Sequence, residues 1–172
     1  MLRTGLAAIG LLALAPAGFA QNEPAGCVSR DSGLTGDLAG WTARKDFGPA
    51  GNSAVARRGE LEIGEAVNAS LLAAHGVVYL AKPGREGAPE SKGGLFALSV
   101  TEPGIYGVAL GAAAWIDVLR DGEPVQSTAH GHGPECSTIR KIVEFSLRPG
   151  DYVVQISGSP DANLPIMVIH RP

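Results

Sequence analysis

The stretch from Val143 to Ile156, VEFSLRPGDYVVQI, decides the fold. Apolar and polar residues alternate on both sides of Pro149-Gly150, as in two strands that each bury one face. A similar stretch, FALSVTEPGIYGVAL, runs from Phe96 to Leu110. In both, a Pro-Gly turn is followed by a tyrosine. We interpret each stretch as a β-hairpin whose turn sets the strand register and whose tyrosine hydroxyl bonds to the backbone, as in a tyrosine corner.

Further short apolar runs follow each other at even spacing and are bounded by turn residues. The strand candidates are Val77–Leu80, Leu95–Val100, Ile105–Leu110, Trp115–Leu119, Ile139–Leu147, Tyr152–Ile156 and Leu164–Ile169. The 24 Gly and 12 Pro in 172 residues oppose long helices. This pattern predicts an all-β fold, a single antiparallel β-sandwich of jelly-roll type over residues 60–172. Residues 21–59 show little periodicity and predict an irregular N-terminal arm, anchored by Cys27 and by Trp41 as an apolar plug.

The first 20 residues predict export. Arg3 precedes an apolar run from Leu6 to Ala15, and small residues stand at Gly18 and Ala20, so residues 1–20 have the parts of a secretory signal peptide. The expected location is periplasmic or secreted. No other apolar stretch approaches the length of a membrane span. The net charge of -3 lacks the basic footprint of a nucleic-acid-binding protein.

The two cysteines, Cys27 and Cys136, predict one disulfide in an oxidising compartment. This bond would join the N-terminal arm to the second half of the chain. The alternative is a Cys136 thiolate that ligates a metal.

The densest cluster of chemically versatile residues is His130-Gly-His132-Gly-Pro-Glu135. In an extended segment, two imidazoles at i and i+2 point to the same side, and Glu135 could complete a facial triad for Fe, Cu or Zn. His75 and His170 are the remaining histidines and could add a ligand. The alternative is a surface turn, because glycine and proline residues interrupt the cluster.

Trp115 and Asp117 form a second candidate site, since they share one face of a predicted strand. A tryptophan beside a carboxylate can hold a sugar or a cation, and core packing is the competing interpretation. The basic pairs Arg57-Arg58 and Arg140-Lys141 are interpreted as solvated charges at strand edges.

From Gly93 to Arg171 the sequence resembles the bacterial pre-peptidase C-terminal type of β-sandwich. The residues that carry the resemblance are Leu95-Phe-Ala-Leu-Ser-Val100, Gly104-Ile-Tyr106, Trp115-Ile-Asp-Val118 and Pro149-Gly-Asp-Tyr152-Val-Val-Gln-Ile156. The resemblance implies a secreted accessory module with a β-sandwich fold.

The stretch from Ala114 through the histidine cluster to Lys141 is similar to small exported bacterial proteins that carry the name homogentisate 1,2-dioxygenase. That resemblance implies a metal-dependent dioxygenase. In the cupin dioxygenase pattern three or four residues separate the second histidine from the glutamate, whereas here two residues separate His132 from Glu135.

The sequence therefore favours an exported, non-catalytic binding or cell-envelope accessory protein, stabilised by one disulfide. Its expected partner is a small molecule, a glycan or an envelope protein. The alternative is a mononuclear metal protein at His130, His132 and Glu135, with dioxygenase activity as its strongest form.

Overall fold

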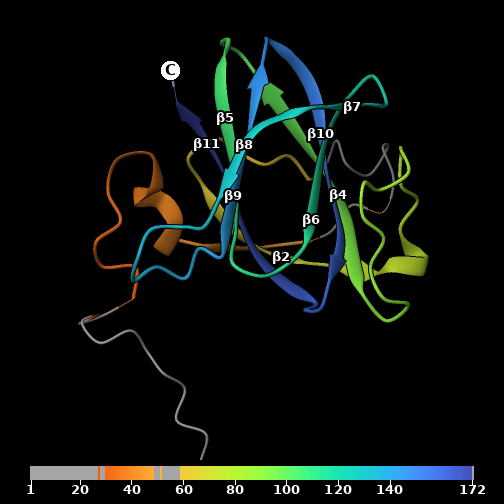
Figure 1. The fold of residues 1–172 in the computed structure, drawn as a ribbon, viewed down its shortest axis with the longest axis horizontal. Helices are drawn as coiled ribbons and strands as arrows, with labels where there is room; N and C mark the ends of the chain where they lie inside the picture. Colours follow the sequence, from red (N-terminus) through yellow and green to blue (C-terminus); the bar gives the residue numbers. More distant parts are fainter. Residues whose placement is uncertain (1–26, 28–29, 49–50, 52–58, 172) are drawn as a thin grey trace, which may run out of the picture.

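The structure, a computed structural model, describes residues 27, 30–48, 51 and 59–171. In these ranges eleven strands form two sheets, which face each other as two layers (Figure 1). The predicted signal peptide lies outside the described residues. No helix of the described ranges is long and apolar enough to cross a membrane.

The larger sheet has the strand order β1-β2-β11-β5-β9-β8. Its strands are β1 (Lys45–Phe47), β2 (Ala66–Ser70), β11 (Asn163–Arg171), β5 (Gly104–Leu110), β9 (Lys141–Leu147) and β8 (Ser127–Gly131). The smaller sheet has the order β3-β4-β10-β6-β7. Its strands are β3 (Leu72–Ala73), β4 (Lys92–Val100), β10 (Gly150–Ser159), β6 (Trp115–Arg120) and β7 (Glu123–Val125). Neighbouring strands pair antiparallel, apart from the parallel pair of β1 and β2. The predicted all-β sandwich is confirmed.

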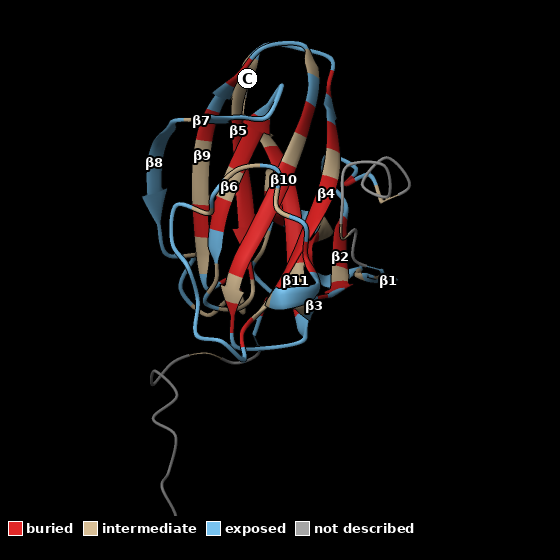
Figure 2. Cartoon of the chain, turned by 90° about the vertical axis from the view of Figure 1, so that its right-hand side faces the viewer, coloured by how far each residue is buried: buried red, intermediate tan, exposed pale blue. Residues whose placement is uncertain are grey.

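The core lies between the sheets and is built from alternate residues of their strands. Phe96 and Leu98 of β4 and Val154 of β10 meet Val108 of β5 and Phe145 of β9, all at most 2% exposed. Figure 2 shows long buried stretches along the inner strands of both sheets. Full burial of such a side chain stabilises the fold by about 1.5–3 kcal/mol.

The two Pro-Gly stretches are not hairpins, which corrects the sequence interpretation. β4 and β5 lie in different sheets, as do β9 and β10, so each turn carries the chain across the sandwich. The strands pair between the two stretches instead, β5 with β9 and β4 with β10. Both strands of each stretch carry an apolar face, and these faces oppose each other across the core.

The tyrosine corners are confirmed at both crossings. Tyr106 donates its hydroxyl to the carbonyl oxygen of Glu102 at 2.9 Å, and Tyr152 donates to that of Arg148 at 2.8 Å. Both rings are buried. Gly150 has a φ of 146°, but Gly104 has no positive φ. A Cβ at Gly104 would instead meet the His170 ring at 2.3 Å.

The described part of the predicted N-terminal arm contains two regular elements. A 3-10 helix, η1 (Gly36–Thr42), lies on the outer face of the larger sheet, and β1 extends that sheet by pairing with β2. Trp41 of η1 is 0% exposed, so the expectation of an apolar plug is confirmed.

Val77–Leu80 is not a strand, which is a second correction. The segment follows a short 3-10 helix, η2 (Ala74–Gly76), and its backbone bonds go to scattered partners. Val78 N–H donates to the carbonyl of Gly51 at 2.8 Å, and Leu80 N–H donates to the Gln155 side chain at 3.1 Å. The apolar run therefore covers the smaller sheet without joining its hydrogen-bond ladder.

Candidate functional site

The predicted disulfide is present between Cys27 and Cys136, with the Cα atoms 5.4 Å apart. This separation lies in the usual range for an unforced bridge. Because the bond consumes the Cys136 sulfur, the alternative of a thiolate metal ligand at this residue is wrong.

The described residues do not bring the three predicted metal ligands together as one group, although His130 and His132 border the same hollow. β8 ends at Gly131, so His130 lies on the strand while His132 lies beyond it, with its Nδ1 3.4 Å from the carbonyl oxygen of Arg140. Glu135 stands exposed in a separate turn closed by the bond from Ser137 N–H to the Pro134 carbonyl. Among the described residues, no group of three or more His, Cys, Asp or Glu side chains could hold a metal ion.

The other two histidines lie in different elements. His75 is part of η2. His170, on β11, stacks on the ring of Tyr106 with the ring centroids 4.4 Å apart. Its Nε2 is buried and has no hydrogen-bond partner. Neither residue supplies a third ligand to the cluster around His130.

Trp115 and Asp117 form a fixed pair on β6, as their shared strand face predicted. The Trp115 Nε1–H donates to Asp117 Oδ1 at 2.8 Å, and the Trp115 residue remains 37% exposed. The competing interpretation of core packing does not apply to this side chain. The indole is held at its polar edge while its ring stays open to solvent.

Asp117 also joins β6 to the loop that contains Gly84 and Arg85 and covers the smaller sheet. Its Oδ2 accepts from Gly84 N–H at 3.1 Å and from Gln155 Nε2 at 3.4 Å. Gln155, on β10, is fully buried, and its Nε2 also donates to the carbonyl of Ala81 at 3.1 Å. Gln155 was missed in the sequence, where its only signal is a polar amide within the apolar run of 152–156.

Gly84 allows the loop to approach Trp115 closely. A Cβ at this position would lie 2.6 Å from the indole Nε1. The loop therefore forms one wall of the space beside the ring, and only glycine permits this contact.

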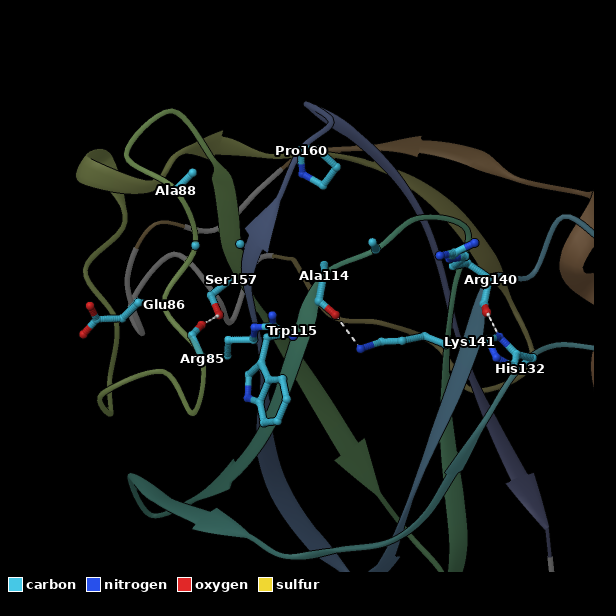
Figure 3. Close-up of a pocket in the computed structure, with 13 residues that line it drawn as sticks. Arg85, Glu86, Ala88, Ala114, Trp115, His132, Arg140, Lys141, Ser157 and Pro160 are labelled. Carbon is cyan, nitrogen blue, oxygen red and sulfur yellow. Dashed lines mark hydrogen bonds between the residues drawn. The ribbon is translucent and has the colours of Figure 1, made fainter. Parts of the chain in front are cut away.

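A cavity of about 640 Å³ lies over Trp115 (Figure 3). The cavity is lined by Arg85, Glu86, Gly87, Ala88, Ala113, Ala114, Trp115, His132, Arg140, Lys141, Ser157, Gly158 and Pro160. A second, more apolar hollow of about 370 Å³ has Trp115, His130, His132, Lys141 and Val143 in its lining. The two hollows share Trp115, His132 and Lys141, and we call them together the Trp115 cleft.

The Trp115 cleft lies between elements of both sheets. Trp115 begins β6 of the smaller sheet, and Lys141 begins β9 of the larger one. The Lys141 ammonium donates to the carbonyl of Ala114 and lies 6.0 Å from the centroid of the indole ring. Burial, together with the positive charge of Arg85, lowers the pKa of Lys141 below its ordinary value. Arg140-Lys141 is therefore more than a solvated pair, since Lys141 is half-buried against the ring.

Two groups in the cleft that could support acid-base or nucleophilic chemistry, Ser157 and His132, face backbone carbonyls. Ser157 donates its hydroxyl to the carbonyl of Arg85 at 3.0 Å, and the nearest partner of His132 is the carbonyl of Arg140. A nucleophile requires a neighbouring base within hydrogen-bond reach. The arrangement of an open aromatic face beside cations instead suits the binding of a ligand.

A scan against protein-family models found no match, and a search of curated proteins found none either. The resemblances to the pre-peptidase C-terminal module and to the proteins named as dioxygenases remain predictions.

Proposed function

We propose that this protein is an exported, non-catalytic binding module that takes a carbohydrate in the Trp115 cleft. The observation that carries the proposal is the Trp115 indole, which is 37% exposed and fixed by Asp117 at 2.8 Å. The apolar C–H face of a sugar ring packs on an aromatic face of this kind, and its hydroxyls bond to surrounding polar groups.

The disulfide supports the export part of the proposal. Such bonds form and persist in oxidising compartments, and Cys27–Cys136 closes a sequence separation of 109 residues. This constraint on the unfolded chain contributes about 4–5 kcal/mol as an upper figure. A module that functions outside the cytoplasm gains stability from such a bond.

The open shape of the cleft implies weak binding of each sugar unit. At about 0.3 kcal/mol per non-hydrogen atom, a hexose of about 12 such atoms gains about 4 kcal/mol, which corresponds to a Kd near the millimolar range. Tight retention would then require a polymer that presents many units to the protein.

Affinity electrophoresis through gels that contain polysaccharides tests the proposal. Trp115→Ala should abolish the retardation that the parent protein shows. Leu72→Ala is the matched control, because Leu72 is 36% exposed and lies at the opposite edge of the smaller sheet, on β3. Equal retardation of the parent protein and Trp115→Ala would overturn the proposed site.

A further inference from the structure

The charge of the Trp115 cleft opposes that of the whole chain. The chain carries a net charge of -3, yet the larger cavity of the cleft is lined by three basic side chains, Arg85, Arg140 and Lys141, against a single carboxylate, Glu86. Such local concentration of one sign in a concave site attracts a ligand of the opposite sign.

The carboxylate does not neutralise these cations. Glu86 Oε1 lies 3.6 Å from Lys82 Nζ, on the loop outside the cleft, and Figure 3 shows its side chain directed away from Trp115. Within the described part of the chain, neither Arg85, Arg140 nor Lys141 forms an ion pair. Their positive charges are therefore available to a ligand.

The basic side chains that line the cavity come from different elements. Arg85 belongs to the loop that covers the smaller sheet, whereas Lys141 begins β9 of the larger sheet and Arg140 directly precedes it. The Lys141 ammonium is 6.0 Å from the centroid of the Trp115 ring. A ring that stacks on the indole would thus bring its substituents close to a cation.

Among the described residues, the Lys141 ammonium has no carboxylate partner. Lys141 is half-buried, its ammonium bonds to the neutral carbonyl of Ala114, and Arg85 repels it. Burial of a cation without a counter-charge is costly, and an anion bound in the cleft would offset that cost.

We infer that the ligand of the Trp115 cleft is an acidic saccharide, whose sugar ring stacks on Trp115 and whose carboxylate pairs with Lys141 and Arg85. The inference rests on the proposed function and narrows it to uronic-acid polymers. Guanidinium and ammonium groups are the usual partners of a carboxylate in proteins, and charge-assisted hydrogen bonds are the strong ones.

The test compares ligands that differ only in charge. Oligosaccharides of galacturonate, glucuronate and mannuronate are titrated calorimetrically beside the same oligomers after reduction of their carboxyl groups to neutral alcohols. At least one acid form should bind about tenfold or more tightly than its neutral counterpart at low salt. The difference should shrink as salt is added.

Variants then assign the effect to residues. Lys141→Gln and Arg85→Gln should each reduce the preference for the acid form severalfold while the neutral form binds as before. Lys45→Gln makes the same change of charge and is the control, because Lys45 pairs with Glu65 at 2.7 Å on β1, at the opposite edge of the larger sheet. Thermal unfolding of each variant establishes that the fold is intact.

The outcomes separate the two proposals. Equal binding of acid and neutral forms, lost in Trp115→Ala, would overturn the acidic ligand and leave the carbohydrate site standing. Saccharide binding that Trp115→Ala does not change, or none at all, would overturn the carbohydrate site itself. Polyphosphate or single-stranded DNA bound as tightly as the uronates, without need of Trp115, would show a general polyanion surface and overturn the inference.

Discussion

The two tryptophans of this protein have similar polar partners and opposite environments. Trp41 is 0% exposed and donates its Nε1–H to Thr138 Oγ1 at 2.9 Å. Trp115 is 37% exposed and donates to Asp117 Oδ1 at 2.8 Å. The local hydrogen bond therefore does not decide whether an indole stabilises the fold or remains open to a ligand.

A cation lies near each indole as well. The guanidinium carbon of Arg44 is 5.3 Å from the centroid of Trp41, and the Lys141 ammonium is 6.0 Å from that of Trp115. Arg44 donates to the carbonyl of Trp41 itself at 2.8 Å, so it closes the same helix. Lys141 reaches Trp115 from the other sheet and borders a cavity.

The difference arises from what covers each ring. Trp41 packs with an apolar cluster on the outer face of the larger sheet, and the helix η1 that carries it forms part of the cover. Trp115 is the first residue of β6, beside the cleft between the sheets, and none of the apolar clusters formed by the described residues includes it. The apolar cluster that packs around Trp41 buries its ring, so this tryptophan stabilises the fold, although both indoles donate a similar hydrogen bond.

Truncation of the two tryptophans should give the largest contrast. Trp41→Ala is expected to lower the free energy of unfolding by about 3–5 kcal/mol, because it empties a buried site. Trp115→Ala should lower it by less than about 1 kcal/mol, since an exposed ring contributes little to stability. Urea unfolding measures both variants. Similar losses would show that Trp115 is also structural and would remove the distinction.

The carboxylates that support the two rings give a smaller contrast. Asp31 is 9% exposed and accepts from both the N–H and the hydroxyl of Thr138, each at 2.6 Å, next to the disulfide. Asp31→Ala leaves these half-buried donors without their carboxylate partner and should cost about 1–3 kcal/mol. Asp117→Ala should cost less, because water can reach the Trp115 and Gly84 donors, and the buried Gln155 amide keeps its bond to the carbonyl of Ala81.

The variants Asp31→Ala and Asp117→Ala should differ in the opposite sense in their affinity for a saccharide. Asp117→Ala frees the Trp115 indole and the Gly84 loop, so saccharide affinity should fall, whereas Asp31→Ala should leave it unchanged. Calorimetric titration at a temperature where both variants are folded compares them. A loss of saccharide affinity in Asp31→Ala alone would contradict this prediction, because binding would then depend on the packing around Asp31 and Thr138 and not on the support of Trp115.

Much of the fold could be predicted because alternation and turn residues mark buried strands. The strands β4, β5, β6, β10 and β11 cover predicted segments, and β9 begins two residues later than the predicted Ile139–Leu147. The pairing of strands could not be predicted, because alternation shows which face is buried and not which strand lies alongside. β8 was missed for a different reason: all five of its residues are exposed, so it has no apolar period (Figure 2).

The candidate site was predictable only where its residues are close in sequence. Trp115 and Asp117 are two residues apart on one strand, so their shared face follows from strand geometry. Arg85, Lys141 and Gln155 come from three other segments, and only the packing of the loop and the two sheets brings them to Trp115. The histidine cluster was predictable in part: an i, i+2 spacing implies a common side only while the strand continues, and β8 ends at Gly131. His130 and His132 still border one hollow, whereas Glu135 lies in a separate turn.

The smallest effect is expected from metal ions, and Trp115 provides the probe. His130 and His132 line the same cleft as this ring, so Cu²⁺ bound between them would quench its fluorescence. We expect that Fe, Cu or Zn ions at equimolar concentration leave the fluorescence and the thermal midpoint unchanged, because the described residues contain no group of ligands arranged for a metal. The variant Trp41→Phe makes Trp115 the sole reporter. Quenching that disappears in His130→Ala/His132→Ala would establish a metal site beside Trp115 and would make the open tryptophan part of a metal centre.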